Sequence, residues 1–290
     1  MKVAFIGAGK VGKSLGSYWA KKGIKILGYY SRSIQSAKEA ALLTESSVFN
    51  TIASLAEEAD LIMITTPDDE IEKVAYDLSN ILLPWDKKIV CHTSGSLSSE
   101  ILSLLNNKGA TIYSLHPMLS FADVNSAKRG LENTFFTVEG KGPKESDFKK
   151  LLDSCKHTYK EICTENKALY HTSACIVSNY LVTLLDTGIE LLDQAGFSEE
   201  TAIALIEPLI RKTLDNSIRF GTKKALTGPI SRGDVGTVHT HIKKLVESGN
   251  QEWLQIYKTM GNKTVKLAES AKKINGQTAK KLYEELGKYE

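Results

Sequence analysis

The sequence lacks the features that mark secreted, membrane-spanning and nucleic-acid-binding proteins. It has only four cysteines in 290 residues, without C-x-x-C spacing, so we expect reduced and mostly buried thiols in a cytoplasmic protein. No stretch of about eighteen apolar residues occurs, and no membrane span is expected. Positive and negative charges nearly balance at +3, which gives no reason to expect a nucleic-acid partner.

Other absences bear on the domain organisation. The chain shows no signal-peptide cleavage region, no internal repeat and no low-complexity linker. Its length of 290 residues is typical of one large or two modest domains with ample area for a core.

The most informative feature that is present lies at the start of the chain. An apolar run ends at Gly7, and Gly7, Gly9 and Gly12 fit G-x-G-x-x-G at the start of a predicted helix. In a dinucleotide-binding turn the first glycine makes the bend, the second lets a diphosphate approach the backbone, and the third lets the helix pack on its strand. Phosphates then bind the free N–H groups of the helix start. The predicted cofactor contacts here are Gly7, Ala8, Gly9, Lys10, Val11 and Gly12.

The same residues also match a competing motif. Residues 7–14 fit G-x-x-x-x-G-K-[ST], the phosphate loop of P-loop nucleotidases. Three features favour the dinucleotide. Gly16 suits close packing of the helix on a sheet, the apolar strand after Asp60 has its acid at the wrong end for a magnesium ligand, and the C-terminal half has a helical pattern.

The segment after the next strand indicates which dinucleotide binds. An NAD-binding domain usually has Asp or Glu about twenty residues past the glycines, where it binds the ribose 2′-hydroxyl. No acidic residue occurs between Gly12 and Glu39. Ser31, Arg32 and Ser33 stand there instead and suit a 2′-phosphate, although the two serines could equally cap the next helix. The sequence therefore favours NADP.

Apolar strands and helices alternate through the first half of the chain. This pattern predicts an α/β fold, a doubly wound Rossmann-type and mostly parallel sheet. From Glu165 the strand signals vanish, and 166–195 is predicted as one long apolar helix. We expect an NADP-binding domain over 1–164, followed by an all-helical substrate and dimerisation domain over 165–290.

Ligands of open α/β sheets bind at the carboxyl ends of the strands. The residues predicted to line the cofactor at these ends are Thr66, Pro67, Ser94 and Gly95. His116 ends a further strand, and the ordinary pKa of histidine suits acid–base chemistry there. His92 lies just inside its strand and is expected to be structural.

The long predicted helix carries polar residues on an apolar background. Lys167, His171 and Ser178 fall on one face, and Asn179 lies roughly 80° around from His171. Such groups destabilise an apolar helix unless they are paired or functional. We therefore predict His171, His116 and Asn179 as catalytic residues, with interhelical hydrogen bonding as the alternative role of Ser178 and Asn179.

A third polar cluster precedes a later helix. Its free N–H groups, Arg232 and Thr237 could receive a substrate carboxylate, while the simpler interpretation makes Asp234 the N-cap of that helix. His239 and His241 point about 200° apart on a helix and cannot share one metal ion, so no metal site is predicted.

These motifs together resemble a known family. The motifs are Gly7-x-Gly-x-x-Gly12, His92-Thr-Ser-Gly95, Ser114-Leu-His-Pro117, Tyr170-His171 with Ser178-Asn179, and Gly228-Pro229-x-x-Arg232-Gly233-Asp234. The family that they resemble pairs a Rossmann-like N-terminal domain with a helical C-terminal domain of unknown function. The layout is more distantly similar to pyrroline-5-carboxylate reductase and the 6-phosphogluconate-dehydrogenase-like superfamily. That resemblance implies a homodimer and a substrate-holding role for Thr237. The Lys and Asn pattern of β-hydroxyacid dehydrogenases is not reproduced, although Lys167 is near the right place.

We therefore predict an NADP-dependent oxidoreductase that transfers a hydride between nicotinamide and a small carbonyl, imine or alcohol, without nucleic-acid or membrane partners. A non-catalytic NADP sensor and a P-loop nucleotidase are the alternatives. The sequence gives neither the substrate nor the direction of the reaction.

Overall fold

The computed structural model describes residues 1–288, which fall into two compact units. Unit 1 comprises Met1–Leu181, and unit 2 begins at Val182. This division lies later in the chain than the boundary at residue 164 that the sequence suggested. The functional roles assigned to the two parts of the chain stay predictions.

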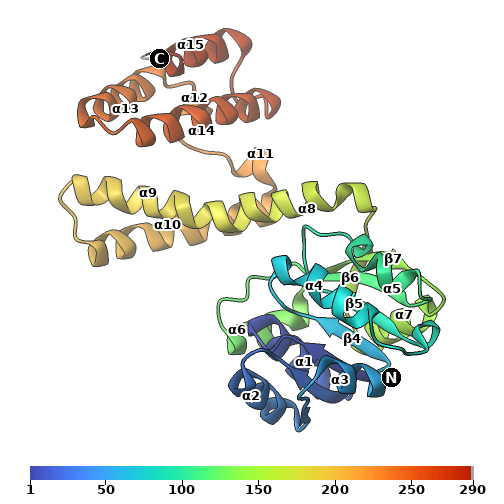
Figure 1. The fold of residues 1–290 in the computed structure, drawn as a ribbon. Coiled ribbons are helices and arrows are strands. Elements are labelled where there is room, and N and C mark those ends of the chain that lie inside the picture. Colours follow the sequence, from blue (N-terminus) through green and yellow to red (C-terminus); the bar gives the residue numbers. More distant parts are fainter. Residues whose placement is uncertain (289–290) are drawn as a thin grey trace. The chain divides into compact units, whose positions relative to one another are not determined.

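Unit 1 is built on an eight-stranded sheet with the order β3-β2-β1-β4-β5-β6-β7-β8 (Figure 1). The strands are β1 (Lys2–Ile6), β2 (Lys25–Tyr30), β3 (Ser47–Val48), β4 (Leu61–Ile64), β5 (Ile89–His92), β6 (Thr111–Pro117), β7 (Phe135–Lys141) and β8 (Thr158–Glu161). Neighbouring strands are parallel except for β6 and β7, which are antiparallel. The order 3-2-1-4-5-6 of the first six is that of the dinucleotide-binding fold. The predicted doubly wound, mostly parallel sheet is confirmed.

Helices cover both faces of this sheet. They are α1 (Lys10–Lys21), α2 (Ile34–Thr44), α3 (Ile52–Glu58), α4 (Asp68–Ser79), α5 (Ser103–Asn106), α6 (Val124–Gly130) and α7 (Glu145–Ser154), with 3₁₀ turns η1 (Trp85–Lys87), η2 (Ser99–Leu102) and η3 (Leu131–Asn133). Side chains alternate along β1, so that Val3 and Phe5 pack under α1, α2 and α7. Ala4 and Ile6 face the other way and pack under α3, α4 and α5.

The helix predicted over 166–195 is interrupted. It begins with η4 (Thr164–Asn166) and α8 (Lys167–Ala174), passes through the π-helical turn η5 (Cys175–Asn179), and continues as α9 (Tyr180–Gln194). A π-turn holds one more residue than an α-turn, so the α-helical angles assumed for Ser178 and Asn179 do not apply. Sequence periodicity could not reveal this turn, because apolar residues lie on every face of the segment.

The same run changes one expectation about membranes. Thr164–Gln194 forms 31 residues of helix that are long and apolar enough to cross a membrane by length and composition. The search for consecutive apolar residues missed it because isolated polar residues interrupt the segment. The finding rests on length and composition alone, and the run carries His171 and Asp186, which a bilayer would accept only at a free-energy cost.

Unit 2 is entirely helical in its described part. Beyond most of α9 it contains α10 (Glu199–Phe220), α11 (Thr222–Ala225), α12 (Pro229–Arg232), α13 (Val235–Ser248), α14 (Gln251–Ser270) and α15 (Gly276–Leu286). Ser198 caps α10 by accepting a hydrogen bond from the Thr201 N–H. Val238, Ile242 and Leu282 lie at the centre of a core formed by α12 to α15.

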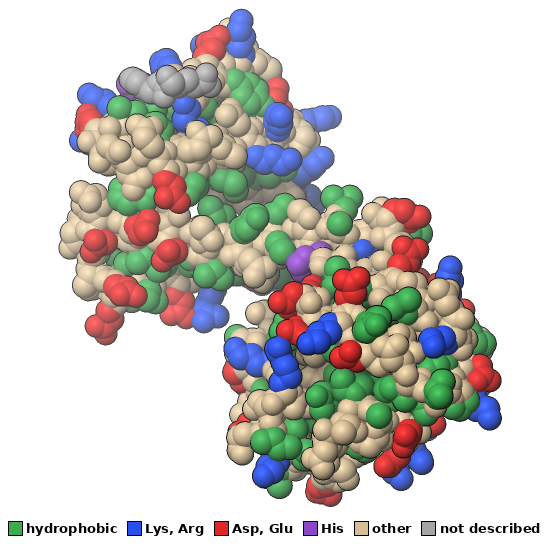
Figure 2. All heavy atoms as spheres, viewed as in Figure 1, with side chains coloured by type: hydrophobic (Ala, Val, Ile, Leu, Met, Phe, Trp, Pro, Cys, Tyr) green, Lys and Arg blue, Asp and Glu red, His purple; other side chains and the backbone are tan. Residues whose placement is uncertain are grey.

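The hairpin of α9 and α10 has almost no core of its own. No residue of α9 is buried, and Ala202 is the buried residue of α10. Figure 2 shows apolar side chains gathered along these two helices. The large exposed ones are Tyr180, Val182, Leu184, Leu191, Ile203, Leu205, Leu209, Leu214, Ile218 and Phe220. Contiguous apolar surface of this kind is rare on monomeric proteins and marks interaction sites.

Candidate functional site

The turn between β1 and α1 depends on its glycines. Gly7 has a φ of +108°, which L side chains rarely adopt, and a Cβ there would lie 2.7 Å from the carbonyl carbon of Thr65. A Cβ on Gly12 would collide with the carbonyl oxygen of Gly7, which also accepts a hydrogen bond from Thr65 Oγ1 at 2.7 Å. Gly9 is different, because nothing lies within 4 Å of its Cβ position. The fold requires the first and third glycines, whereas the second leaves open space.

A cavity of about 210 Å³ opens at this turn. Among its lining residues are Gly7, Ala8, Gly9, Ser31, Arg32, Thr66 and Pro67. Gly9 is the N-cap of α1 and has no side chain with which to cap it, so the first N–H groups of the helix are free to bind an anion. Thr66 Oγ1 is buried without a hydrogen-bond partner within residues 1–288. The open space, the free N–H groups and the unpaired hydroxyl fit the phosphates of a dinucleotide.

The residues specific to a P-loop lie elsewhere. Lys13 Nζ forms an ion pair with Glu39 of α2 at 2.6 Å, and Ser14 is fully buried. A P-loop nucleotidase needs this lysine at the phosphates and this hydroxyl at the magnesium ion. Neither residue lines the cavity, and neither does Lys10, although the sequence predicted a contact there. The geometry favours a dinucleotide over a nucleoside triphosphate.

Charged residues meet at the end of β2. Arg32 Nη1 donates a hydrogen bond to Glu70 Oε1 of α4 at 2.7 Å, and both residues line the cavity. Lys73, one turn further along α4, also lines it. Ser33 accepts a hydrogen bond from the Ser36 N–H and so has the capping role that the sequence left open. Sequence reasoning missed Glu70 and Lys73, because they are far from the β2 end in the chain.

His92, at the end of β5, is structural in this fold. Its Nδ1 accepts a hydrogen bond from the Ser94 N–H at 3.2 Å, and its Nε2 lies 3.0 Å from the carbonyl oxygen of Ser98. The ring is therefore neutral, with its proton on Nε2. Burial lowers the pKa of His92 to about 4. The Ser94 hydroxyl donates to Asp68 Oδ2 at 2.6 Å and so joins this loop to the start of α4.

Two histidines meet over Gly95. The rings of His116 and His171 lie 6.0 Å apart at 77°. A Cβ on Gly95 would lie 2.5 Å from His171 Cδ2 and 2.8 Å from His116 Nε2, so both rings approach a point that only glycine leaves free. His116 Nδ1 bonds the Tyr170 hydroxyl at 2.8 Å, which leaves Nε2 for a ligand. Burial, aided by the charge of Lys167, lowers the pKa of His116 to about 4, so this ring is neutral near pH 7.

A buried lysine lies beneath these histidines. Lys167 of α8 is 1% exposed, and its Nζ donates to Ser114 Oγ at 2.6 Å and to the Ser94 carbonyl oxygen at 3.3 Å. Burial lowers the pKa of its ammonium group. No ion pair within residues 1–288 involves this side chain. The sequence placed Lys167 on the face of His171 but did not select it. Its spacing of four residues from that histidine was the available signal.

The third predicted catalytic residue lies apart. Asn179 ends the π-turn η5 with its side chain exposed, and the described part of the chain gives it no side-chain hydrogen bond. The structure thus brings His116 and His171 together but leaves Asn179 outside the pair.

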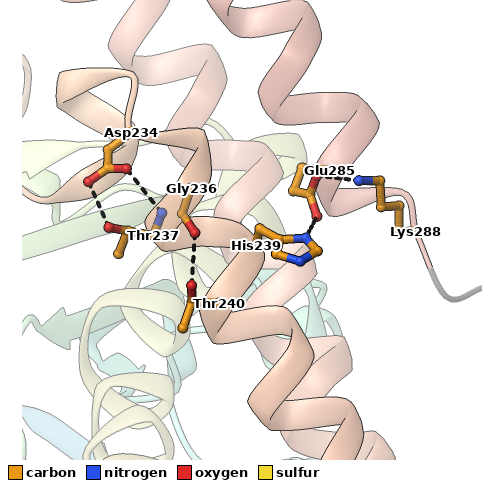
Figure 3. Close-up of polar contacts among 7 residues, drawn as sticks. All are labelled: Asp234, Gly236, Thr237, His239, Thr240, Glu285 and Lys288. Carbon is orange, nitrogen blue, oxygen red and sulfur yellow. Dashed lines mark hydrogen bonds and ion pairs between the residues drawn. The ribbon is translucent and has the colours of Figure 1, made fainter.

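In the cluster before α13, Asp234 and Thr237 bind each other (Figure 3). Asp234 caps α13, accepting hydrogen bonds from the Thr237 N–H at 3.0 Å and the Thr237 hydroxyl at 2.6 Å. Asp234 is therefore the N-cap of α13, as the simpler interpretation predicted. The Thr237 hydroxyl donates its hydrogen bond to Asp234, so it is not free to bind a substrate carboxylate. His239 pairs with Glu285 at 2.6 Å, and His241 bonds the hydroxyl of Tyr257 at 2.8 Å.

Comparison with protein families divides the chain in two. Residues 1–117 match the Rossmann-like domain, and residues 134–264 match a domain of unknown function, DUF2520. The chain therefore combines these two domains, as the motifs indicated. A sequence comparison with curated proteins finds no match.

Solved structures share the fold over nearly the whole chain. Protein TM1727 from Thermotoga maritima is 27% identical, with a TM-score of 0.63 over 97% of this chain and 98% of that one. Protein BF3122 from Bacteroides fragilis is 20% identical, with a TM-score of 0.72 over 91% and 98%. The pyrroline carboxylate reductase of Plasmodium falciparum, with NADP bound, is 16% identical, with a TM-score of 0.60 over 98% and 99%. At the two lower identities the likeness concerns the fold alone.

Proposed function

We propose that this chain is an NADP-dependent oxidoreductase that transfers a hydride between the nicotinamide ring and a small carbonyl, imine or alcohol. One observation carries the proposal: a phosphate-sized opening at Gly9 belongs to the same unit as the histidine pair at the ends of β5 and β6. The fold shared with an NADP-bound reductase supports it. In open α/β sheets this edge is where ligands bind.

The residues present suit the parts of the coenzyme. The free N–H groups of α1 bind the diphosphate and Arg32 binds the 2′-phosphate, while Thr66 and Pro67 line the same cavity. Ser94 and Gly95, in the loop that follows β5, lie outside that lining and contact the nicotinamide end of the coenzyme in this proposal. When bound, the coenzyme supplies the hydride.

The protein must orient the substrate and handle one proton. His116 is neutral near pH 7, so its Nε2 polarises the substrate oxygen or nitrogen by a hydrogen bond rather than by carrying a charge. His171, across Gly95 from it, is the group that exchanges the proton. The Lys167 ammonium fixes Ser114 and the Ser94 carbonyl, and thereby the strand ends that hold the pair. Asn179 orients the substrate in this proposal.

Coenzyme binding can be tested without knowing the substrate. Gly9→Ala should fold normally, because its added methyl group meets nothing within 4 Å. The methyl group should nevertheless occupy the space of the diphosphate and weaken NADPH binding at least about tenfold, a change of about 1.4 kcal/mol. Calorimetry measures the affinity, with Gly276→Ala in unit 2 as the matched control, because Gly276 also has open space at its Cβ position and no left-handed φ. Equal NADPH affinity in Gly9→Ala and the unmodified protein would refute this mode of binding.

Turnover separates an enzyme from a sensor. NADPH oxidation is followed with a panel of keto acids, cyclic imines and ketones, and NADP reduction with alcohols. A sensor binds NADPH but turns over nothing on the panel, and a P-loop nucleotidase binds ATP with magnesium. The oxidoreductase proposal requires turnover that His171→Ala lowers, typically by 10²- to 10⁴-fold for a proton-transfer group.

We further propose that the protein works as a homodimer in the cytoplasm. The four cysteines are free, as expected in a reducing compartment. The exposed apolar side chains of α9 and α10 suit a second copy, because a twofold interface covers each copy with an identical apolar surface. Sedimentation should give a dimer that Ile218→Glu dissociates and Lys212→Glu does not. A monomeric unmodified protein would rule out this assembly.

A further inference from the structure

The adenosine end of the cavity combines an arginine with a carboxylate from another element. Arg32 follows β2, while Glu70 lies in the first turn of α4. β2 and β4, the strand that precedes α4, flank β1 on either side in the sheet. The end of β2 and the start of α4 are therefore neighbours in space. Arg32 Nη1 lies 2.7 Å from Glu70 Oε1, and the Arg32 side chain is 75% exposed against 26% for Glu70. The carboxylate is thus the more buried partner and the guanidinium the more exposed one.

This pair supplies the acid that the sequence lacks between Gly12 and Glu39. In NAD-binding domains an acid at the end of the second strand accepts the ribose 2′-hydroxyl, whereas an arginine accommodates the 2′-phosphate of NADP. Here Glu70, from α4, lines the same cavity as Arg32. A 2′-hydroxyl could donate to Glu70 while the ion pair persists. A 2′-phosphate must instead take Arg32 away from Glu70 and lie near a second negative charge.

The other charged residues that line the cavity favour neither the 2′-hydroxyl nor the 2′-phosphate. Lys73 adds one cation and Asp77 one anion, so Arg32 and Lys73 are balanced by Glu70 and Asp77. A pocket built to select NADP would carry an excess of cations around a phosphate.

We propose that Glu70 is a coenzyme-specificity residue that holds the 2′-hydroxyl of NAD and restrains the preference for NADP, so that the pocket accepts both coenzymes. The proposal rests on the proposed function, since it assumes that a nicotinamide dinucleotide occupies this cavity. Arg32 and Lys73 bind the 2′-phosphate, and Glu70 competes with it for Arg32.

The test compares dissociation constants of NADPH and NADH, by calorimetry at constant ionic strength, for the full-length chain. The unmodified protein should bind both, with NADPH favoured by less than about tenfold. Glu70→Gln should tighten NADPH and weaken NADH, changing their ratio by about ten- to hundredfold, the range expected for a hydrogen bond to a charged group. Glu72→Gln is the matched control, because Glu72 is an exposed acid of the same helix that does not line the cavity. Thermal melts check that each variant is folded.

A substitution of Arg32 completes a double-mutant cycle with Glu70→Gln. Arg32→Gln should weaken NADPH about tenfold or more and change NADH little, and the double variant Arg32→Gln with Glu70→Gln measures the coupling between the two side chains. If neither coenzyme binds the unmodified protein, the proposed function itself fails. If both bind and the ratio is unchanged in Glu70→Gln, or if that variant weakens NADPH, the specificity role alone is overturned.

Discussion

Acid should destabilise unit 1 through histidines that the fold keeps neutral. His157 is 8% exposed, and its Nε2 accepts a hydrogen bond from Trp19 Nε1 at 2.7 Å. A proton on Nε2 would break this bond. Burial lowers the pKa of His157 to about 4, from 6.5 in the ordinary state. His92, 0% exposed, has the same depressed pKa.

The sign and size of the effect follow from linkage. Below pH 6.5 the unfolded chain binds protons at these positions and the folded chain does not, so stability is full above pH 6.5 and is lost as pH falls toward 4. With about 1.4 kcal/mol per pKa unit, each histidine removes about 2 kcal/mol of unfolding free energy between pH 7 and pH 5. Ordinary carboxylates scarcely titrate in that interval.

Urea unfolding at pH 7 and pH 5 measures this loss. The chain has three tryptophans, so a Trp253→Phe background leaves Trp19 and Trp85, both in unit 1, as the fluorescent probes. His157→Gln should be less stable than the background at pH 7 but lose about 2 kcal/mol less on acidification. His239→Gln, at an exposed position of unit 2, should leave the loss unchanged. An identical loss in His157→Gln and the background would contradict the reasoning.

Three further perturbations test the site. Gly95→Ala should lower turnover about 100-fold even at saturating NADPH, because its Cβ would lie within 2.8 Å of both imidazole rings; calorimetry measures any accompanying loss of NADPH affinity separately from the kinetics. Gly7→Ala should lower the unfolding free energy by about 1–3 kcal/mol, since φ is +108° and Thr65 is in contact, as urea titration would show. Lys167→Met should raise the pKa of His116 by removing a nearby positive charge, which a histidine Cε1–H titration by NMR measures, with His116→Gln identifying the signal. An unchanged pKa of His116 in Lys167→Met would show that the charge of Lys167 does not lower it.

The fold was predictable from local patterns. Gly7 and Gly12 are needed for the turn whatever binds there, and continuous apolar runs such as Leu61–Ile64 have few alternatives to buried parallel strands. The π-turn after Ala174 was not predictable, because adding one residue to a turn leaves no mark in an apolar segment.

The site was predictable where it depends on strand ends and not where it depends on contacts between elements. His116 and His171 meet because one ends β6 and the other lies on α8, whose first residue anchors in the sheet. The angle predicted for Asn179 assumed an unbroken α-helix, and the π-turn changes that angle. Glu70 was not predictable from the residues that follow β2, because it lies on α4, which is distant in the chain, and only the fold brings it to Arg32.

The buried Lys167 at the start of α8 determines which of the two units holds the proposed site. Lys167 ties the helix bearing His171 to the side chain of Ser114 in β6 and to the backbone of Ser94 in the loop after β5, all within unit 1. The histidines that we propose as reacting groups, His116 and His171, therefore both belong to unit 1. A chimaera that takes unit 2 from a related chain should therefore keep both the cavity at Gly9 and the histidine pair.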